Sequence, residues 1–371
     1  MTDNICCMDF DAMEAFMVDV FKGLGVPAED AAVCADVLIA ADKRGIDSHG
    51  VGRLKPIYYD RIVHHKVQVP VTEFEIVREL GATAVVDGHH GMGMVIAKRC
   101  MQMAIDKAAE FGIGMVVARD STHYGIAGYY PLMACNAGML GMCGTNARPS
   151  IAPTFGVENM LGTNPLVFAF PTDEPFPFTN DYATSVSQRG KIEQYAREGK
   201  ALPAGWVIDR EGRTRTDAEA VLDELVAGTA ALVPVGGIGE ETAGYKGYGY
   251  ATVVEILSAA LQQGAFLKQL SGFDADGNRV PYRLGHFFMA VNISAFTELE
   301  AFKKTTGDIL RALRGSQKAP GAERIYTCGE KEHLAWLERK DSGVPLGTEL
   351  QKQIITMRDE LGLDGYRFAF E

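Results

Sequence analysis

The spacing of hydrophobic residues predicts helices at the beginning of the chain. Hydrophobic residues from Met13 to Leu24 recur at helical intervals, and Asp9 or Asp11 is a candidate N-cap for this run. Pro27 is placed to open a second helix, whose hydrophobic residues continue up to Gly45. We therefore expect about the first 70 residues to be helical.

The middle of the chain changes to alternating strands and helices. A strand over 82–86, a helix over 91–111 and a strand over 113–118 form a predicted βαβ unit. Further hydrophobic, β-branched and aromatic runs predict strands at 139–144, 166–170, 231–235 and 286–291. Helical patterns lie between them at 130–136, 191–198 and 248–261. The fold class predicted for this region is α/β with a mixed sheet.

Helical patterns return in the last part of the chain, at 296–314, 331–339 and 348–361. We expect the two helical ends to pack together as one helical domain, into which the sheet domain is inserted. The predicted division is residues 1–75, 76–295 and 296–371. No repeat or low-complexity tract interrupts this pattern.

Composition narrows the class of protein. The chain has 371 residues, of which 47% are hydrophobic and 23% charged, as in folded soluble proteins. A net charge of −12 argues against nucleic acid or an anionic membrane surface as partner. The seven cysteines form no Cys-x-x-Cys pair, which indicates reduced thiols. With neither a signal peptide nor a hydrophobic stretch long enough to cross a bilayer, we expect a cytoplasmic protein.

One segment, RGIDSHGVGRL at residues 44–54, concentrates candidate chemistry at the end of a helical pattern. A histidine exchanges a proton near neutral pH, and an arginine can hold a carboxylate through two parallel hydrogen bonds. Glycines let the backbone approach a bound molecule closely. The segment suits a small anionic carbonyl or hydroxy compound, although a histidine beside glycine at a helix end is often only a surface feature.

The sequence lacks the standard nucleotide-binding motifs. In the nearest match to G-x-G-x-x-G/A, at 91–97, the third small residue comes one place late, and no P-loop is present. Four polar or glycine-rich turns nevertheless follow predicted strands, at 121–125, 144–146, 162–165 and 244–249. Such turns can present N–H groups to phosphates, and Lys246 adds a positive charge at the last one. Each turn taken alone is also typical of ordinary strand–helix connections.

Taken together, segments along the chain resemble the malate/L-lactate dehydrogenase family of nicotinamide-dependent oxidoreductases. The matching segments are RGIDSHGVGRL (44–54), STHYGIAGYY (121–130), LGTNPLVFAFP (161–171), DYATSVSQRGKIE (181–193), GYKGYGYATVVEILSAAL (244–261), GHFFMAVN (285–292) and CGEKE (328–332). They cover nearly the whole chain. The family also includes sulfolactate, ureidoglycolate and cyclic-imine-reducing members. The resemblance implies a non-Rossmann nucleotide-binding domain, and a homodimer with the active site near the subunit interface.

The resemblance also implies catalytic roles. It implies that His49 is the proton-transferring histidine and that Ser48 and Asp181 relay the proton. It also implies that Arg53 binds the substrate carboxylate. A hydroxyl and a carboxylate near an imidazole would fix its tautomer and support its charged form. His123 is the competing base. We favour His49 because Ser48 and Arg53 flank it.

The resemblance implies NAD or NADP as the cofactor, and the sequence does not distinguish between the two. The implied contacts are His123, Tyr124, Gly125, Asp181, Ala183, Thr184, Ser185, Tyr245, Lys246, Gly247, Gly329 and Glu330. Thr163 and Asn164 are expected near the substrate or the nicotinamide. Two residues depart from the family pattern: Tyr182 replaces a smaller or sulfur-containing residue, and Cys328 replaces a frequent proline.

We therefore predict an NAD(P)-dependent oxidoreductase that interconverts a small 2-hydroxy acid and its 2-oxo acid by hydride transfer. Malate and oxaloacetate are favoured, because residues 175–200 and 244–257 look like the malate-type branch. Lactate, sulfolactate, a ureidoglycolate-like acid and a cyclic imine are the alternatives. Arg44, Arg148 and Lys55 are candidates for holding a second carboxylate.

Two other classes of function are less well supported. A metal-dependent lyase or hydrolase would need a ligand cluster, and His89, His90 and His123 do not show the spacing of one, so we predict no metal site. A non-catalytic ligand-binding protein has no need to keep Ser48 and His49 intact.

Overall fold

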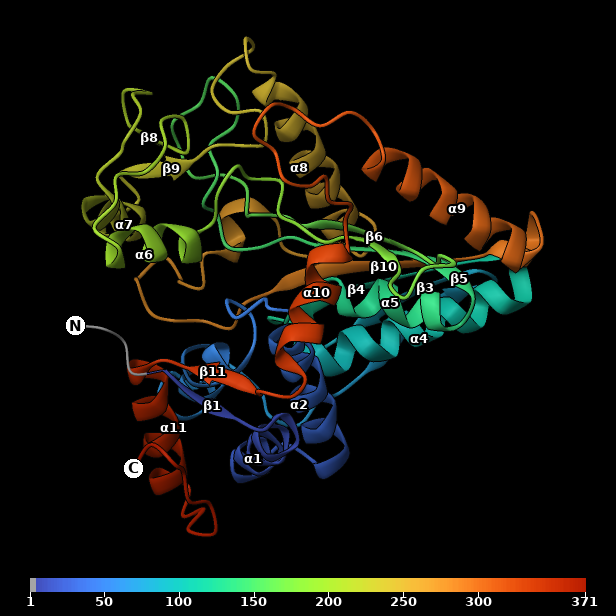
Figure 1. Ribbon diagram of the computed structural model, residues 1–371. Coiled ribbons are helices and arrows are strands. Elements are labelled where there is room, and N and C mark those ends of the chain that lie inside the picture. Colours follow the sequence, from blue (N-terminus) through green and yellow to red (C-terminus); the bar gives the residue numbers. More distant parts are fainter. Residues whose placement is uncertain (1–4) are drawn as a thin grey trace.

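The computed structural model describes residues 5–371 (Figure 1). Its α-helices are α1 (Phe10–Gly23), α2 (Ala28–Lys43), α3 (Asp60–Val63), α4 (Gly93–Phe111), α5 (Tyr129–Asn136), α6 (Arg189–Arg197), α7 (Ala218–Ala227), α8 (Gly244–Ala259), α9 (Leu299–Arg314), α10 (Glu330–Arg339) and α11 (Thr348–Glu360). Its strands are β1 (Cys6–Met8), β2 (Glu75–Leu80), β3 (Thr83–Asp87), β4 (Ile113–Ser121), β5 (Met139–Thr145), β6 (Leu166–Phe170), β7 (Phe178–Asn180), β8 (Val207–Asp209), β9 (Ala230–Leu232), β10 (Leu284–Asn292) and β11 (Val344–Leu346). Short helical turns are η1 (Val51–Arg53), η2 (Leu54–Tyr59), η3 (Leu267–Leu270) and η4 (Ile293–Ala295).

The first two helices begin where the sequence predicts. The Asp9 side chain accepts a hydrogen bond from the Ala12 N–H at 3.0 Å and caps α1. Pro27 is the N-cap residue of α2, whose end leads into Gly45, a residue with φ of +72°. The two helices predicted here are therefore confirmed, whereas the strand β1 was not predicted.

The central element is a seven-stranded mixed sheet in the order β2-β3-β4-β10-β5-β6-β7. Strands β3 and β4 pair in parallel, with Thr83 opposite Met115, and α4 connects them. This confirms the predicted βαβ unit and the α/β class. The other neighbouring pairs in this sheet are antiparallel.

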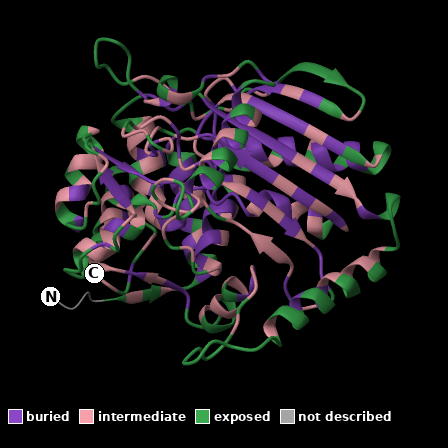
Figure 2. Ribbon diagram, turned by 90° about the horizontal axis from the view of Figure 1, so that it is seen from above, coloured by how far each residue is buried: buried purple, intermediate pink, exposed green. Residues whose placement is uncertain are grey.

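Both faces of the sheet are covered by helices, with α4 and α5 on one side and α8 on the other (Figure 1). Alternate residues of a strand point to opposite faces. Val116 and Phe288 therefore join the core under α4 and α5, whereas Val117 and Phe287 join Val254 of α8. Figure 2 shows the central strands mostly buried.

A second core combines the two ends of the chain. It includes Phe16 of α1, Tyr58 of η2, and Ile354 of α11. Strand β1 pairs antiparallel with β11, with Cys6 opposite Leu346. Helix α9 instead runs beside the sheet (Figure 1). The domain boundaries at 75 and 295 remain a prediction.

A smaller layer of α6, α7, β8 and β9 packs around a third hydrophobic cluster. Strand β9 is shorter than the strand expected over 231–235. None of the helices in residues 5–371 combines the length and the hydrophobicity needed to cross a lipid bilayer.

Candidate active site

A cavity of about 730 Å³ opens between the sheet, the smaller layer of α6, α7, β8 and β9, and the loop after α2. Its wall brings together residues from 46–49, 123–127, 145–147, 163–165, 181–188 and 235–236, with Lys191, Trp206 and Leu284. Three of the four polar turns singled out in the sequence meet here. The fourth, 244–249, forms the beginning of α8, directly behind the wall: a side chain on Gly247 would collide with the Val235 carbonyl oxygen.

Hydrogen bonds of Asp42 and Arg339 hold the loop that carries His49. The Oδ2 atom of the Asp42 carboxyl group accepts a hydrogen bond from the Val51 N–H at 2.8 Å. On the other side, Arg339 of α10 donates to the Asp42 carbonyl oxygen at 3.1 Å and pairs with Asp47. His49 is thereby fixed at the edge of the cavity.

His49 lies beside the two residues that the sequence placed with it. Ser48 Oγ is 2.9 Å from His49 Nδ1, and Arg53 Nε donates to the Ser48 carbonyl oxygen. Burial, and secondarily the Arg53 guanidinium, lowers the pKa of His49 to about 4. The imidazole is therefore neutral at pH 7 and ready to accept a proton.

His123 follows β4 and also lines the cavity. Its Nδ1 atom is 2.7 Å from the Tyr58 hydroxyl and 3.3 Å from the Gly125 nitrogen. Burial, followed by the charges of His49 and Arg61, lowers the pKa of His123 well below its usual value. The rings of His49 and His123 lie 6.1 Å apart between centroids, with 17° between their planes.

Asp181 follows β7 and lies on the same wall. Its Oδ2 atom accepts a hydrogen bond from the Gly128 N–H at 2.8 Å. Burial raises the pKa of Asp181 to about 6, although the Gly128 N–H and Arg44 act in the opposite direction. Within residues 5–371, no hydrogen bond joins Asp181 to Ser48 or His49. The relay from Asp181 to His49 remains a prediction.

The cofactor-binding residues expected around Asp181 divide into two groups. Those on the cavity wall are His123, Tyr124, Gly125, Asp181, Ala183 and Ser185. Thr184 lies behind the wall and donates to the carbonyl oxygens of Thr163 and Asn164, which ties two wall segments together. The Oγ atoms of Ser185 and Ser187 are buried and have no hydrogen-bond partner among residues 5–371.

Of the two substrate-side residues, Thr163 lines the cavity and Asn164 does not. The Asn164 amide is buried and donates to the Ala251 carbonyl oxygen at 3.1 Å and to Glu255 at 2.8 Å. It fastens the wall to α8, and its contacts give it a structural role.

The remaining expected cofactor residues lie outside the wall. Tyr245 and Lys246 are exposed at the beginning of α8. Gly329 lines a neighbouring hollow of about 300 Å³ that shares Ile46 and Asp181 with the larger cavity. Glu330 is buried and paired with Arg324.

The same hollow includes Arg44, one of three candidates for a second carboxylate. Of the other two, Lys55 is paired with Asp60 at 2.8 Å, and Arg148 is exposed. Neither Lys55 nor Arg148 is part of the cavity wall.

Several residues of the site were not identified from the sequence. Tyr58, Ser187, Gln188, Lys191 and Trp206 lie on the cavity wall or contact a residue on it. Tyr58 is 65 positions away from His123 along the chain. Only the fold brings the two together, and no local motif signals their contact.

Residues 8–355 match the family model described as malate/L-lactate dehydrogenase. The chain belongs to this family. It is 42% identical to a malate dehydrogenase of Pyrococcus horikoshii, across 98% of each chain. It is 36% identical to an L-sulfolactate dehydrogenase of Methanocaldococcus jannaschii, across 94% of this chain and 95% of the relative.

Solved structures agree with the sequence relatives. A crystal structure of malate dehydrogenase from Entamoeba histolytica superposes with a TM-score of 0.94 at 40% identity, covering 99% of this chain and 100% of that one. The protein is thus an oxidoreductase of the malate/L-lactate dehydrogenase family, with the mixed α/β fold of that family.

Membership of a dehydrogenase family implies a nicotinamide cofactor, and the cavity suits one. The two unpartnered hydroxyls of Ser185 and Ser187 offer hydrogen bonds to a polar ligand. Gly236, at φ of +97°, brings backbone close to the same wall. The volume of about 730 Å³ lies within the range of cofactor sites.

Proposed function

We propose that this protein is an NAD(P)-dependent malate dehydrogenase, which interconverts malate and oxaloacetate. The observation that carries the proposal is a neutral His49 on the wall of the large cavity, with Arg53 behind it, close enough for its charge to lower the pKa of His49. The 42% identity to a relative named malate dehydrogenase supports malate over the other 2-hydroxy acids of the family.

In the proposed mechanism His49 is the acid–base group. His49 Nε2 would take the hydroxyl proton of the hydroxy acid and the oxygen electron pair would form the carbonyl, with a bound nicotinamide supplying the acceptor for the hydride of C2. Ser48 Oγ lies at His49 Nδ1 and orients the ring. Proton transfer by a positioned group of this kind contributes roughly 10²–10⁴ in rate.

Arg53 holds a substrate carboxylate. It lies within the loop of His49 and is fixed there by its bond to the Ser48 carbonyl oxygen. An arginine binds a carboxylate through two parallel hydrogen bonds, which sets C2 of the substrate at a fixed place. Arg61, whose charge also lowers the pKa of His123, adds to the positive potential that attracts a dianion.

The cofactor, when bound, supplies the hydride acceptor or donor. We assign its binding to the wall from Ala183 to Ser187, where two hydroxyls await partners, and to Gly236. Lys246 lies at the positive end of α8, on the side from which phosphates would be attracted.

We further propose a homodimer in the cytoplasm, as the family resemblance and the seven free cysteines suggest. Light scattering coupled to size-exclusion chromatography measures the mass. A mass of one chain would contradict the dimer.

The experiment that tests the function follows nicotinamide absorbance with the purified protein. NADH and NADPH are each tried with oxaloacetate, pyruvate, sulfopyruvate and a cyclic imine. We expect fast oxidation with oxaloacetate, and a His49→Ala loss of roughly 10²–10⁴ in kcat. Faster turnover of another substrate would replace malate in the proposal, and full activity of the alanine variant would refute the role of His49.

A further inference from the structure

The ring nitrogens of His123 have unequal surroundings. Its Nδ1 atom lies 2.7 Å from the Tyr58 hydroxyl and 3.3 Å from the Gly125 nitrogen. A backbone N–H can only donate a hydrogen bond, so Nδ1 must accept the one from Gly125. A neutral imidazole that accepts at Nδ1 carries its proton on Nε2.

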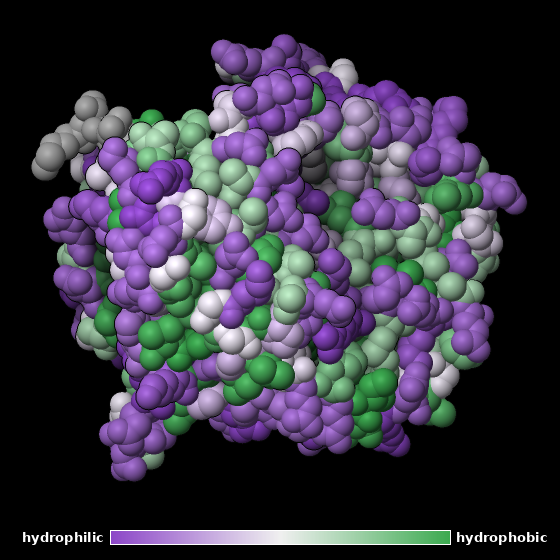
Figure 3. Space-filling view, turned by 90° about the horizontal axis from the view of Figure 1, so that it is seen from below, coloured by the Kyte–Doolittle hydropathy of each residue, from purple (hydrophilic) through white to green (hydrophobic). Residues whose placement is uncertain are grey.

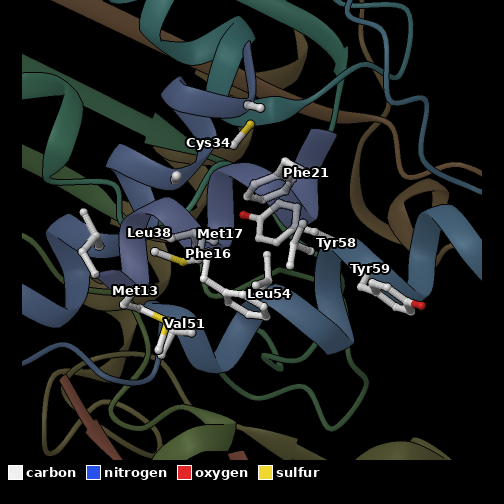
Figure 4. Packing of buried hydrophobic residues seen from close by; sticks show 14 of the residues in the cluster. Met13, Phe16, Met17, Phe21, Cys34, Leu38, Val51, Leu54, Tyr58 and Tyr59 are labelled. Atoms are coloured by element: carbon white, nitrogen blue, oxygen red, sulfur yellow. The ribbon is translucent and has the colours of Figure 1, made fainter. Parts of the chain in front are cut away.

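Tyr58 is built to be the second donor. It lies on the π-helical turn η2, a type of turn that is frequent at functional sites. Its ring is fully buried, edge-on to Phe21 at 5.7 Å between centroids, in the cluster shown in Figure 4. Burial raises the pKa of Tyr58 well above its usual value, so the phenol keeps the proton that it donates to His123.

The partner of His49 is different in kind. Ser48 Oγ at 2.9 Å from Nδ1 is a hydroxyl, which accepts an Nδ1–H as readily as it donates. His49 can therefore carry its proton on Nδ1 and keep the Nε2 lone pair for a substrate proton. No backbone N–H faces Nδ1 of His49 in the described chain.

We propose that Tyr58 and the Gly125 N–H hold His123 as its Nε2–H tautomer, so that His123 donates a hydrogen bond to the reacting oxygen while His49 removes the proton. This assignment rests on the proposed function. The O–H bond breaks toward His49 Nε2, its electron pair becomes part of the carbonyl, and C2 releases hydride to the nicotinamide. His123 transfers no proton and stabilises the negative charge on oxygen.

The alternative, His123 as the base, conflicts with its surroundings. A lone pair on Nε2 would require the proton on Nδ1, where it would face the Gly125 N–H. Two donors in contact leave both hydrogen bonds unmade in a buried site. The rings of His49 and His123 lie 6.1 Å apart between centroids, and both residues line the cavity that would hold the substrate.

Nitrogen NMR of the protein labelled with ¹⁵N-histidine tests the tautomer without turnover. The resonances are assigned with His123→Gln and His49→Gln. We expect a protonated Nε2 and an unprotonated Nδ1 in His123, and a smaller excess of this tautomer in Tyr58→Phe, where the Gly125 N–H is the one donor left at Nδ1. A protonated Nδ1 in His123 of the unaltered protein overturns the inference, whichever substrate the enzyme uses.

Kinetics test the division of labour between the histidines. A glutamine amide keeps an N–H donor but is no base. We expect His123→Gln to retain kcat within about ten-fold, and His123→Ala to lose roughly 10²–10³, as when an oxyanion donor is removed. His49→Gln should lose roughly 10²–10⁴. Equal loss in the glutamine and alanine variants of His123 would make it the base and overturn the inference.

Tyr58→Phe has a matched control in the next residue. Tyr59 is also buried, but its hydroxyl donates to Glu360, away from the cavity. We expect kcat to fall about ten-fold in Tyr58→Phe, as for one lost hydrogen bond, with unchanged KM, and no change in Tyr59→Phe. Full kcat in a folded Tyr58→Phe overturns the role of Tyr58.

Discussion

Asp42 supports the loop of His49 with a carboxyl group that is almost completely buried, at 1% exposure. Burial, and to a smaller extent Asp47, raises the pKa of Asp42 to about 8, while the Val51 N–H and Arg339 act in the opposite direction. At pH 7 the folded protein therefore keeps this carboxyl protonated, whereas the unfolded chain ionises it near pH 3.8.

The pH dependence of stability follows from this difference. Because the unfolded state loses its proton first, the Asp42 carboxyl destabilises the fold increasingly as pH rises from about 4 to about 8. Asp42→Asn keeps an acceptor for Val51 and cannot ionise. The difference in unfolding free energy between Asp42→Asn and the unaltered protein should therefore shift in favour of the variant, by roughly a few kcal/mol between pH 4 and pH 8.

Urea unfolding at pH 5 and pH 8 measures the effect. Asp47→Asn is the control, because its carboxyl is exposed and paired with Arg339. A difference between Asp42→Asn and the unaltered protein that is the same at both pH values would show that Asp42 is ionised in the fold.

At the scale of single residues, the sequence predicted those parts of the site that lie in one segment. Ser48, His49 and Arg53 are neighbours along the chain, and the structure keeps them together. Asn164 shows the limit: its polar side chain is used inside the protein, by Ala251 and Glu255. A sequence pattern does not tell whether an amide faces a cavity or the protein interior.

Helix α8 illustrates how an element shapes the site without entering it. A Cβ atom on Gly247 would collide with the backbone of Val235, the residue that begins the 235–236 wall. Gly249, two residues later, is exposed and has open space where its Cβ would be. The two glycines thus differ in packing within one helix.

This contrast gives a matched pair of variants. We expect Gly247→Ala to push α8 from the wall and to weaken NADH binding at least ten-fold, measured by fluorescence titration. Gly249→Ala should bind NADH normally and gain up to about 1 kcal/mol of stability, because alanine favours a helix interior. Normal binding in Gly247→Ala would show that the wall at Val235 does not hold the cofactor.

The elements that could be predicted are those with a strong hydrophobic period. The buried strands β4, β5 and β10 and helices α1, α2 and α4 were found from sequence. Strand β2 was missed because all its residues are exposed, so its side chains show no buried face. Helix α7 was also missed, although Asp217 caps its beginning and Gly228 ends it.

At the scale of the whole molecule, the two chain ends close around one core. Neither end forms this core alone, since β1 needs β11 and the side chains of α1 need the last residues of the chain. Hydrophobic and hydrophilic residues are mixed over the face seen in Figure 3, which is usual for a folded protein surface. No local sequence motif marks the pairing of the two chain ends. The helical patterns at both ends nevertheless predicted that the ends pack together.

Phe368, which three residues follow in the sequence, tests how far this closure stabilises the fold. Its ring is 8% exposed and meets Phe16 of α1 edge-on, at 5.4 Å between centroids. Phe368→Ala should lower the free energy of unfolding by about 3 kcal/mol, because it leaves a cavity between the ends. Phe296→Ala, at a ring that is 79% exposed, is the control and should change the free energy of unfolding by less than about 0.5 kcal/mol.

Urea unfolding measures the stability of both variants, and equal stability of the two would show that the C-terminal residues are not part of the cooperative core. Since Phe368 is not on the cavity wall, NADH binding at 25 °C should be the same in both variants.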